Sequence, residues 1–210
     1  MKLRNLAVLA SLMMACLPVY AGEFCQTLKA CQRQAKAGSA VAQAEMGLRY
    51  QRGEGVKQNV EKALYWFRKA AAQGNPTGLE EVGTAYYRED GVERDNSKAI
   101  EWWKQAAEKG KSSAMWWLGY IYTRENKDVV LDKQQGCEWF RKSAEQGGEQ
   151  WVGGANPSYY ELGLCYYHGE GLPKDDAKAI YWLEKARKYE QEDVDEIDEL
   201  LKKIRQSQSQ

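Results

Sequence analysis

The sequence predicts an all-α protein, a right-handed α/α superhelix (solenoid) of about four helix-pair repeats with an N-terminal half repeat and a C-terminal capping helix. The first observation is a period of 36 residues, which separates Gly47 from Gly83 and Gly83 from Gly119. The second is that Trp66 and Trp102 keep the same period. A fixed period of this length is the signature of helical repeats, because one helix pair cannot bury its apolar face alone and must stack on the next pair.

The first helix of each repeat carries an apolar residue, a glycine, and an aromatic or apolar residue three positions further on. This spacing places the three residues on one stripe of a helix. Glycine costs a helix about 1 kcal/mol, so we expect it to permit the close approach of a neighbouring helix. A glycine-containing turn such as residues 53–56 follows, because glycine adopts positive φ at little cost. The first helices are expected near residues 41–52, 77–88, 113–124 and 157–168.

The second helix of each repeat carries the pattern Lys-Ala-x-x-Trp, as in KALYWFRKAAAQG at residues 62–74 and KAIEWWKQAAEKG at residues 98–110. The alanine pair near its end is small enough to allow close contact with the next repeat. Asn and Asp, which suit the capping of exposed backbone amides, stand near the helix start. The second helices are expected to begin near Asn59, Asn96, Lys133 and Asp176, and the repeats are residues 39–74, 75–110, 111–147 and 148–189.

Both ends of the array are expected to be capped. Residues 24–37 match the second helix of a repeat, with Gly38 one period before Gly74, and predict a half-repeat cap over residues 22–38. Residues 190–210 have acidic side chains at the start and basic ones towards the end, as the helix dipole favours. They predict a C-terminal capping helix followed by a short tail. The apolar stripe of this helix is formed by Val194, Ile197, Leu200, Leu201 and Ile204.

These repeats resemble the Sel-one-like repeat (SLR) family, a relative of the tetratricopeptide repeat. The resemblance is carried by Leu/Met/Val-Gly-x-x-Tyr in the first helix, Gly-x-Gly-Val in the turn and Lys-Ala-x-x-Trp-x-x-x-Ala-Ala in the second helix, over about residues 38–189. The third repeat departs from this pattern, since its turn between Arg124 and Lys133 lacks both glycines. An insertion, Gly148 to Asn156, also separates repeats three and four.

The first residues of the chain predict export. Two basic residues precede an apolar run over residues 6–20, and the small residues Val19 and Ala21 end it. This pattern predicts a signal peptide, residues 1–21. A membrane anchor is an alternative, but the run is shorter than the roughly 20 residues that a span needs. A lipoprotein attached at Cys16 is another. We therefore expect a periplasmic or secreted protein that has no membrane span after cleavage.

Charge and motifs argue against several classes of function. Without Lys2 and Arg4, 28 basic side chains stand against 30 acidic ones, so the net charge of the cleaved chain is near −2. Nucleic-acid binding needs a clustered excess of Lys and Arg, and none is expected here. One histidine, His168, cannot supply a His-Glu-x-x-His metal site, and no serine β-lactamase motif occurs. We predict a protein that is not an enzyme and needs no metal or cofactor.

Four cysteines follow the predicted cleavage site, at positions 25, 31, 137 and 165. In an oxidising compartment they suggest two disulfides with three possible connectivities, whereas four small buried thiols are the alternative. Cys137 falls one turn into the second helix of repeat three, and Cys165 one turn before the end of the next first helix. Because these helices should be antiparallel neighbours, we predict a disulfide between Cys137 and Cys165. Cys25 and Cys31 then pair by elimination, provided that Cys25 precedes the helix.

The resemblance implies a binding face on the concave side, because tetratricopeptide-type solenoids bind ligands there, along their first helices. Positions −3, +1, +4 and +5 from the repeat glycine should point to it. Aromatic side chains and arginine are enriched at interface centres, and arginine can hold a carboxylate with two hydrogen bonds. The alternative is that these aromatics fill the core. The candidate partner-binding residues are Arg52, Arg88, Trp116, Tyr120, Arg124, Tyr160, Tyr167 and His168, whereas Tyr50, Tyr86, Tyr122 and Tyr166 are expected in the core.

The sequence therefore favours a module that binds another protein or peptide outside the cytoplasm. The resemblance implies a sharper version, an immunity protein against a toxin or effector that acts in the periplasm, and an envelope-assembly adaptor fits equally well. A hydrolase of cell-wall or β-lactam substrates is the alternative from another class, because the family includes cysteine-rich secreted members described as penicillin-binding or β-lactamase-like. Those members carry a cysteine pair in nearly every repeat, an arrangement that this chain lacks.

Overall fold

The computed structural model describes Cys25 and residues 27–124, 126, 128–146, 156–189 and 194–208. The predicted signal peptide, Cys16 and residues 148–155 of the predicted insertion lie outside the described residues. The described part forms ten α-helices and contains no strand, which confirms the predicted all-α repeat fold. In chain order the helices are α1 (Leu28–Lys36), α2 (Ala40–Arg52), α3 (Val60–Ala71), α4 (Pro76–Arg88), α5 (Asn96–Glu108), α6 (Ser112–Thr123), α7 (Lys133–Glu145), α8 (Ser158–His168), α9 (Asp176–Tyr189) and α10 (Val194–Ser207).

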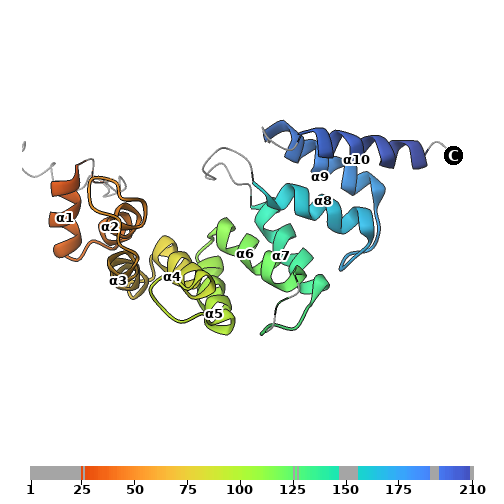
Figure 1. Ribbon diagram of the computed structural model, residues 1–210. Helices are drawn as coiled ribbons and strands as arrows, with labels where there is room; N and C mark the ends of the chain where they lie inside the picture. Colours follow the sequence, from red (N-terminus) through yellow and green to blue (C-terminus); the bar gives the residue numbers. More distant parts are fainter. Residues whose placement is uncertain are drawn as a thin grey trace, which may run out of the picture.

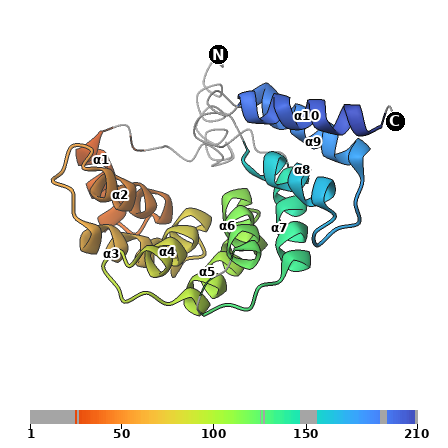
Figure 2. The same cartoon turned by 45° about the vertical axis from the view of Figure 1, so that its right-hand side comes forward.

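The helices stack in pairs along an arc (Figure 1). The pairs α2/α3, α4/α5, α6/α7 and α8/α9 form the four repeats, and most contacts join helices that are consecutive in the chain. Figure 2 shows α2, α4, α6 and α8 along the concave side of the arc and α3, α5, α7 and α9 along its outer side. The first helix of each repeat therefore lines the concave side.

A glycine in each first helix lets the second helix of the same repeat approach closely. Gly83 is buried, and a Cβ atom added to it would lie 2.7 Å from Cδ1 of Trp103, well inside van der Waals contact. The steric role that the sequence predicts for these glycines is therefore present in the structure. The glycines and the large side chains that they face are Gly47 and Phe67, Gly83 and Trp103, Gly119 and Phe140, and Gly163 and Leu183.

One backbone hydrogen bond closes every helix pair at the same place. The residue just before the second helix donates its N–H to the carbonyl of a tyrosine near the end of the first helix. This bond fixes where the second helix starts relative to the first. The donor and acceptor pairs are Asn59 and Tyr50 (2.8 Å), Asp95 and Tyr86 (3.1 Å), Asp132 and Tyr122 (2.9 Å), and Asp175 and Tyr166 (3.0 Å).

Of the two expectations about these positions, the starts of the second helices are confirmed and the burial of the tyrosines is wrong in part. The helices α5 and α7 begin at Asn96 and Lys133, as predicted, and the carboxylates of Asp95 and Asp132 cap them by accepting from the backbone amide three residues on. Of the four tyrosines expected in the core, only Tyr166 is buried, whereas the rings in the other repeats are half-buried. These three rings pack against the edge of the core, and lysines lie over two of them, as Lys98 does 5.5 Å from the ring centre of Tyr86.

The turn inside a repeat is built in two ways. In repeats one, two and four, the residue after the first helix is left-handed: Gly53 has φ 77°, Glu89 φ 65° and Gly169 φ 70°. In repeat three Asn126 instead accepts hydrogen bonds on its side-chain oxygen from the backbone N–H of Asp128 and of Val129 (2.8 Å). This side-chain turn explains how the third repeat bends without the two glycines.

Both ends are closed as expected. Cys25 and Cys31 are bonded, with 4.8 Å between their Cα atoms, and Cys25 precedes the first turn of α1. At the other end α10 buries Ile197, Leu201 and Ile204. Within the part of the chain that the structure describes, no helix is long and apolar enough to cross a membrane.

Candidate functional site

Neighbouring repeats meet at three junctions, which we number from the N-terminus. At the first junction α2 and α3 meet α4, at the second α4 and α5 meet α6, and at the third α6 and α7 meet α8. The third junction contains the Cys137–Cys165 disulfide, with 6.1 Å between the Cα atoms. Both half-cystines are buried, and the pairing is the one predicted from the positions of the helices.

The predicted arginines recur at the ends of the first helices, but their surroundings differ. Arg52 lies 3.5 Å from the carboxylate of Glu54 in its own turn. The guanidinium of Arg88 lies over the ring of Trp117, 5.4 Å from its centre. Arg124 forms an ion pair, 2.9 Å from Glu161 in the next repeat.

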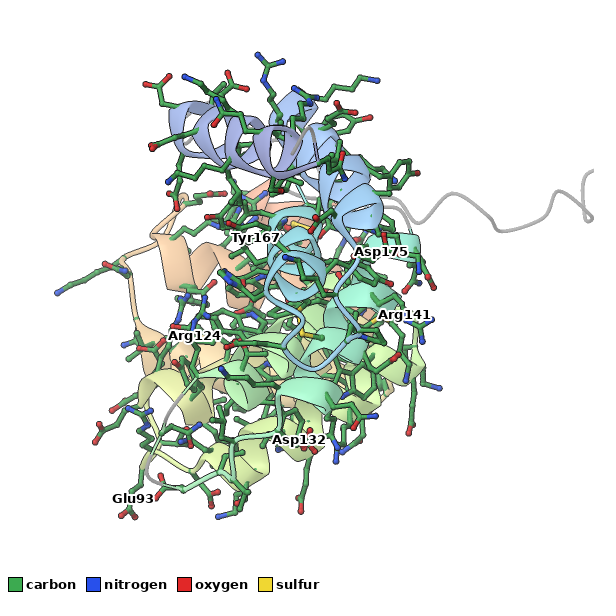
Figure 3. The ribbon with its side chains drawn as sticks, turned by 90° about the vertical axis from the view of Figure 1, so that its right-hand side faces the viewer. Glu93, Arg124, Asp132, Arg141, Tyr167 and Asp175 are labelled. Atoms are coloured by element: carbon green, nitrogen blue, oxygen red, sulfur yellow. A yellow bond between two sulfur atoms is a disulfide. The ribbon has the colours of Figure 1, made fainter. Side chains whose placement is uncertain are left out.

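The candidates in the fourth repeat are already engaged with neighbouring side chains. The hydroxyl of Tyr160 donates to Glu196 of α10 at 2.8 Å, which ties this ring to the C-terminal cap. Tyr167 contacts the ring of His168 edge-on, with 4.8 Å between the centroids. Figure 3 views the arc from its C-terminal end and shows Arg124 and Tyr167 on one side of the molecule, opposite Arg141. The structure therefore brings Tyr167 and Arg124 onto a common face.

Among the described residues, the largest group of contacting rings lies at the second junction, and we call it the aromatic cluster. The rings of Trp103 and Trp117 stack with an interplanar angle of 8° and a centroid distance of 5.3 Å. Tyr87 lies 5.7 Å from Trp103 and 5.5 Å from Trp117. Trp103 is fully buried, whereas the other rings are half-buried and belong to α4 and α6, which line the concave side. The cluster comprises Tyr87, Trp103, Trp116, Trp117 and Tyr120.

Three guanidinium groups lie over rings of the aromatic cluster. Arg88 covers Trp117, Arg94 covers Tyr87 at 5.2 Å, and Arg124 covers Tyr120 at 5.3 Å. Among the described residues, no carboxylate lies within ion-pair distance of Arg88 or Arg94. A stacked guanidinium keeps its N–H edge available, so these two side chains can take a carboxylate from another molecule.

Sequence reasoning missed Trp103, Trp117 and Arg94. Trp117 occupies the position that Glu81 and Glu161 occupy in the flanking repeats. The glutamates at this position indicate a solvated helix face, so Trp117 was not predicted to belong to the site. Its neighbour in sequence, Trp116, carried the expected spacing and was chosen instead. Two consecutive tryptophans on a helix that lines the concave side were the signal that both rings contribute.

The pKa values of two carboxyl groups are shifted, that of Glu81 at the first junction and that of Glu161 at the third. Burial raises the pKa of Glu81, and the charge of Glu80 raises it further, whereas a hydrogen bond from Gln51 opposes the shift. Burial also raises the pKa of Glu161, although Arg124 favours the charged form. Desolvation therefore outweighs pairing at both carboxyl groups.

A pocket of about 260 Å³ opens at the third junction, and we call it the third-junction pocket. Phe140, Leu164 and the disulfide form its apolar walls. Charged side chains lie around it, including Arg124 and Glu161. Its size suits one large side chain better than a drug-sized molecule, for which pockets usually exceed about 300 Å³. The lining is Thr123, Arg124, Lys133, Cys137, Phe140, Glu161, Leu164, Cys165, His168 and Glu170.

The aromatic cluster and its guanidinium groups place apolar surface and N–H donors side by side. Within the described residues no group of three or more His, Cys, Asp or Glu side chains could hold a metal ion. Half-buried rings with stacked guanidinium groups can bury apolar surface of a partner and bind its carboxylates in one place. The concave face is thus suited to holding another polypeptide.

The repeats match a known protein family along most of the chain. The matching family is the Sel1 repeat, and the matched residues are 40–75, 77–111, 112–148 and 156–188. The chain belongs to the Sel1 repeat family. Sel1 repeats generally mediate protein–protein interaction, and their scaffold is typically non-enzymatic. Among curated proteins, none matches this chain.

Several solved structures are similar to this Sel1 repeat chain. One is c5321, a protective antigen present in uropathogenic Escherichia coli strains that displays an SLR fold, at 34% identity and a TM-score of 0.66 over 75% of this chain and 32% of that one. Another is a Sel1 repeat protein from Oxalobacter formigenes, at 33% identity and a TM-score of 0.69 over 82% of this chain and 48% of that one. The chain therefore spans about a third of the length of the first of these relatives and about half of the length of the second.

Proposed function

We propose that this chain is an extracytoplasmic protein-binding module that holds its partner on the concave face, centred on the aromatic cluster. The observation that carries the proposal is the pairing of half-buried rings with Arg88 and Arg94, which stack on them and lack carboxylate partners among the described residues. Rings and arginines of this kind dominate the energetics of protein interfaces. Membership of the Sel1 repeat family supports the same function.

A location outside the cytoplasm is part of the proposal. Two cysteine pairs at bonding distance support it, because structural disulfides persist in oxidising compartments and are rare in the cytosol. The signal-peptide pattern of residues 1–21 supports it independently.

The finer proposal is that the partner is a toxin or effector and that this chain is its immunity protein. The concave face supports a role in occlusion, since a partner held there would have part of its surface covered. An envelope adaptor would use the same face, so the two roles differ in what the bound partner can no longer do. Loss of a partner's toxic activity on binding favours immunity, and an unchanged activity favours the adaptor.

The test begins with capture of partners by the full-length tagged chain from the envelope of its source cells, followed by titration of each captured protein. Trp116→Ala and Tyr120→Ala should each weaken binding by about 2 kcal/mol, about 30-fold in Kd. Arg88→Glu should weaken binding by about tenfold or more if its N–H edge meets a carboxylate.

The matched control is Lys104→Glu, which reverses a charge on the exposed face of α5, on the outer side of the same repeat. It should bind like the wild type. Equal affinity of all the concave-face variants would show that the partner binds elsewhere. Turnover of a chromogenic β-lactam by the purified wild type would favour the hydrolase instead.

A further inference from the structure

One space recurs between neighbouring repeats, and its three copies are filled differently. It is bounded by a last-turn residue of one first helix, by the large residue of the following second helix, and by a residue of the next first helix. Because the three copies share one backbone setting, they form an internal comparison. The bounding residues are Gln51, Phe67 and Glu81 at the first junction, Tyr87, Trp103 and Trp117 at the second, and Thr123, Phe140 and Glu161 at the third.

The first copy is closed by a hydrogen bond. The amide of Gln51 is long enough to cross the space and donates to the carboxylate of Glu81 at 3.0 Å. The cavity that remains measures about 10 Å³. A space of that size holds no more than about one water molecule.

The second copy is filled by rings from the chain itself. Tyr87 takes the place of Gln51, and Trp117 takes the place of Glu81. Both rings pack on Trp103, which is the equivalent of Phe67 and Phe140. The backbone geometry of a junction therefore accommodates an aromatic ring against the large side chain of the second helix.

The third copy has neither a hydrogen bond across the space nor, among the described residues, a ring of the chain that fills it. Thr123 takes the place of Tyr87, and its hydroxyl donates to the backbone carbonyl of Gly119 at 2.9 Å, one turn back in its own helix. The threonine is too short to bond to Glu161 across the space as Gln51 bonds to Glu81. The space stays open as the third-junction pocket of about 260 Å³.

The chemistry of this pocket matches one kind of side chain. Its lining includes the partly exposed, apolar Leu164, with the fully buried ring of Phe140 behind the pocket surface. Glu161 supplies a half-buried carboxylate, and Arg124 contacts one of its two oxygens, at 2.9 Å. An ionised carboxylate has about four acceptor sites, so Glu161 can accept a further hydrogen bond from a group inside the pocket.

We propose that the third-junction pocket takes a tyrosine side chain of the protein bound on the concave face. The ring would lie against Leu164 and Thr123, whose partly exposed side chains line the pocket, and the hydroxyl would donate to Glu161. The inference rests on the proposed function, because the tyrosine belongs to the partner. It adds the residue type that the partner inserts and the place where that residue enters.

The first experiment uses p-cresol, which has the shape and hydroxyl of a tyrosine side chain, on the full-length oxidised protein. Methyl NMR signals of Thr123 and Leu164 should shift saturably, with a Kd on the order of 1 mM. Cross-relaxation peaks between p-cresol and the Leu164 methyl groups place the ring in the wild-type pocket. Shifts confined to other residues, or the absence of saturation up to about 20 mM, would overturn the inference.

Variants test the two contacts separately. Thr123→Tyr fills the pocket from within, as Tyr87 fills the second junction, and should abolish p-cresol binding. Glu161→Gln keeps the shape of the side chain. In the wild type p-cresol should bind about tenfold more tightly than toluene, and Glu161→Gln should remove most of that difference. Circular dichroism checks each fold. If Thr123→Tyr does not fold, the wild-type cross-relaxation peaks and the Glu161→Gln comparison still decide the matter.

The captured partner separates this inference from the proposed function. If Thr123→Tyr weakens partner binding at least tenfold and p-cresol competes with the partner, the pocket takes a partner side chain. If the aromatic-cluster variants lose binding while Thr123→Tyr retains it, the pocket inference is wrong and the proposed function stands. If no concave-face variant affects binding, the proposed function itself is wrong, whatever p-cresol does.

Discussion

The interface of α3 with α4 and the interface of α7 with α8 join equivalent helices by different means. At the first, small residues let the backbones touch: a Cβ atom added to Gly78 would lie 2.7 Å from Cβ of Ala70 and equally close to the backbone N of Ala71. At the second, Ser143 stands in the place of Ala70, and Ser158 stands in the place of Gly78. The same contact is apolar in one joint and polar in the other.

The polar joint is fully hydrogen-bonded. The hydroxyl of Ser158 donates to the hydroxyl of Ser143 at 2.8 Å, and Ser143 donates to the carbonyl of Ser112 at 2.9 Å. The buried side chain of Asn156 donates to the carbonyl of Ser143 and accepts from the N–H of Ser158. Buried polar groups are tolerated only when they are paired in this way.

The difference corresponds to the chain that connects the helices. Only a short turn separates α3 from α4, so the turn itself sets where α4 begins, and small residues suffice. The predicted insertion precedes α8, and a longer connection fixes the position of the next helix less tightly. Directional hydrogen bonds and the disulfide supply that position instead. A solenoid can therefore accept extra residues at a joint when the joint itself becomes more specific.

The largest predicted effect is the loss of the Cys137–Cys165 bond. The Cys137→Ala/Cys165→Ala double variant should lower the free energy of unfolding by between about 3 and 4 kcal/mol, because the bond closes a loop between residues 28 positions apart. Because each repeat contacts only its neighbours, hydrogen exchange should rise most in α7 and α8. Chemical denaturation of the oxidised protein measures the loss.

Two further variants provide reference values for the free energy lost with the Cys137–Cys165 bond. Cys137→Leu with Cys165→Ala copies Leu64 and Ala85 of the first junction, and should recover about 1–2 kcal/mol of the loss through apolar burial. Removal of the Cys25–Cys31 bond, with a sequence separation of 6, should cost less, about 2 kcal/mol. A greater loss at the N-terminal bond than at the third junction would contradict the comparison.

An intermediate effect is expected from the serines. Ser143→Ala should destabilise the protein by about 1–2 kcal/mol, because it leaves the carbonyl of Ser112 and the hydroxyl of Ser158 without their partner. The Ser143→Ala/Ser158→Ala double variant copies Ala106 and Ala114 of the second junction and should cost less than the single variant. Thermal and denaturant unfolding of the set measure this coupling. A double variant that is less stable than Ser143→Ala would show that the polar joint cannot be exchanged for an apolar one.

The smallest effect is the pH dependence of the junction carboxyl groups. The pKa of Glu81 and the pKa of Glu161 are both raised by burial, so the stability that each contributes is full below the ordinary carboxyl pKa and is lost as the pH rises through the raised value. Relative to the wild type, Glu81→Gln and Glu161→Gln should therefore be more favourable at pH 7 than at pH 4. Unfolding measured across this range tests the sign.

Glu170 provides the opposite control within the same pocket. A hydrogen bond from Lys133 lowers its pKa, so its contribution is present at neutral pH and is lost as the pH falls through the lowered value. Glu170→Gln should therefore be less favourable at pH 7 than at low pH. Because this pair is exposed, high salt should reduce the difference.

The repeat positions were predictable because they obey local rules. The glycine that faces Phe67 or Trp103 recurs with the period, and a recurring small residue on an apolar stripe has one simple explanation. The Cys137–Cys165 bond followed from the same register. Every one of these inferences needs only the spacing of residues along the chain and the stacking of consecutive helices.

The content of each junction was not predictable in that way. Gln51, Tyr87 and Thr123 occupy one position, yet one bonds across the junction, one fills it and one leaves it open. The outcome depends on the partner residue of the next repeat, Glu81 in one case and Trp117 in another. Pairwise side-chain contacts across a joint carry no periodic signal, so the sequence pattern located the concave face but not its centre.

The placement of the two disulfides has a mechanical consequence. Each links cysteines within one local unit, at α1 or across the third junction, and within the described residues no bond between cysteines joins the first two repeats to the last two. The two disulfides therefore hold the stack covalently at α1 and at the third junction. Small rotations at the first and second junctions can widen or narrow the concave face, and only noncovalent contacts oppose them. The face can therefore bind partners of different curvature without strain on a disulfide.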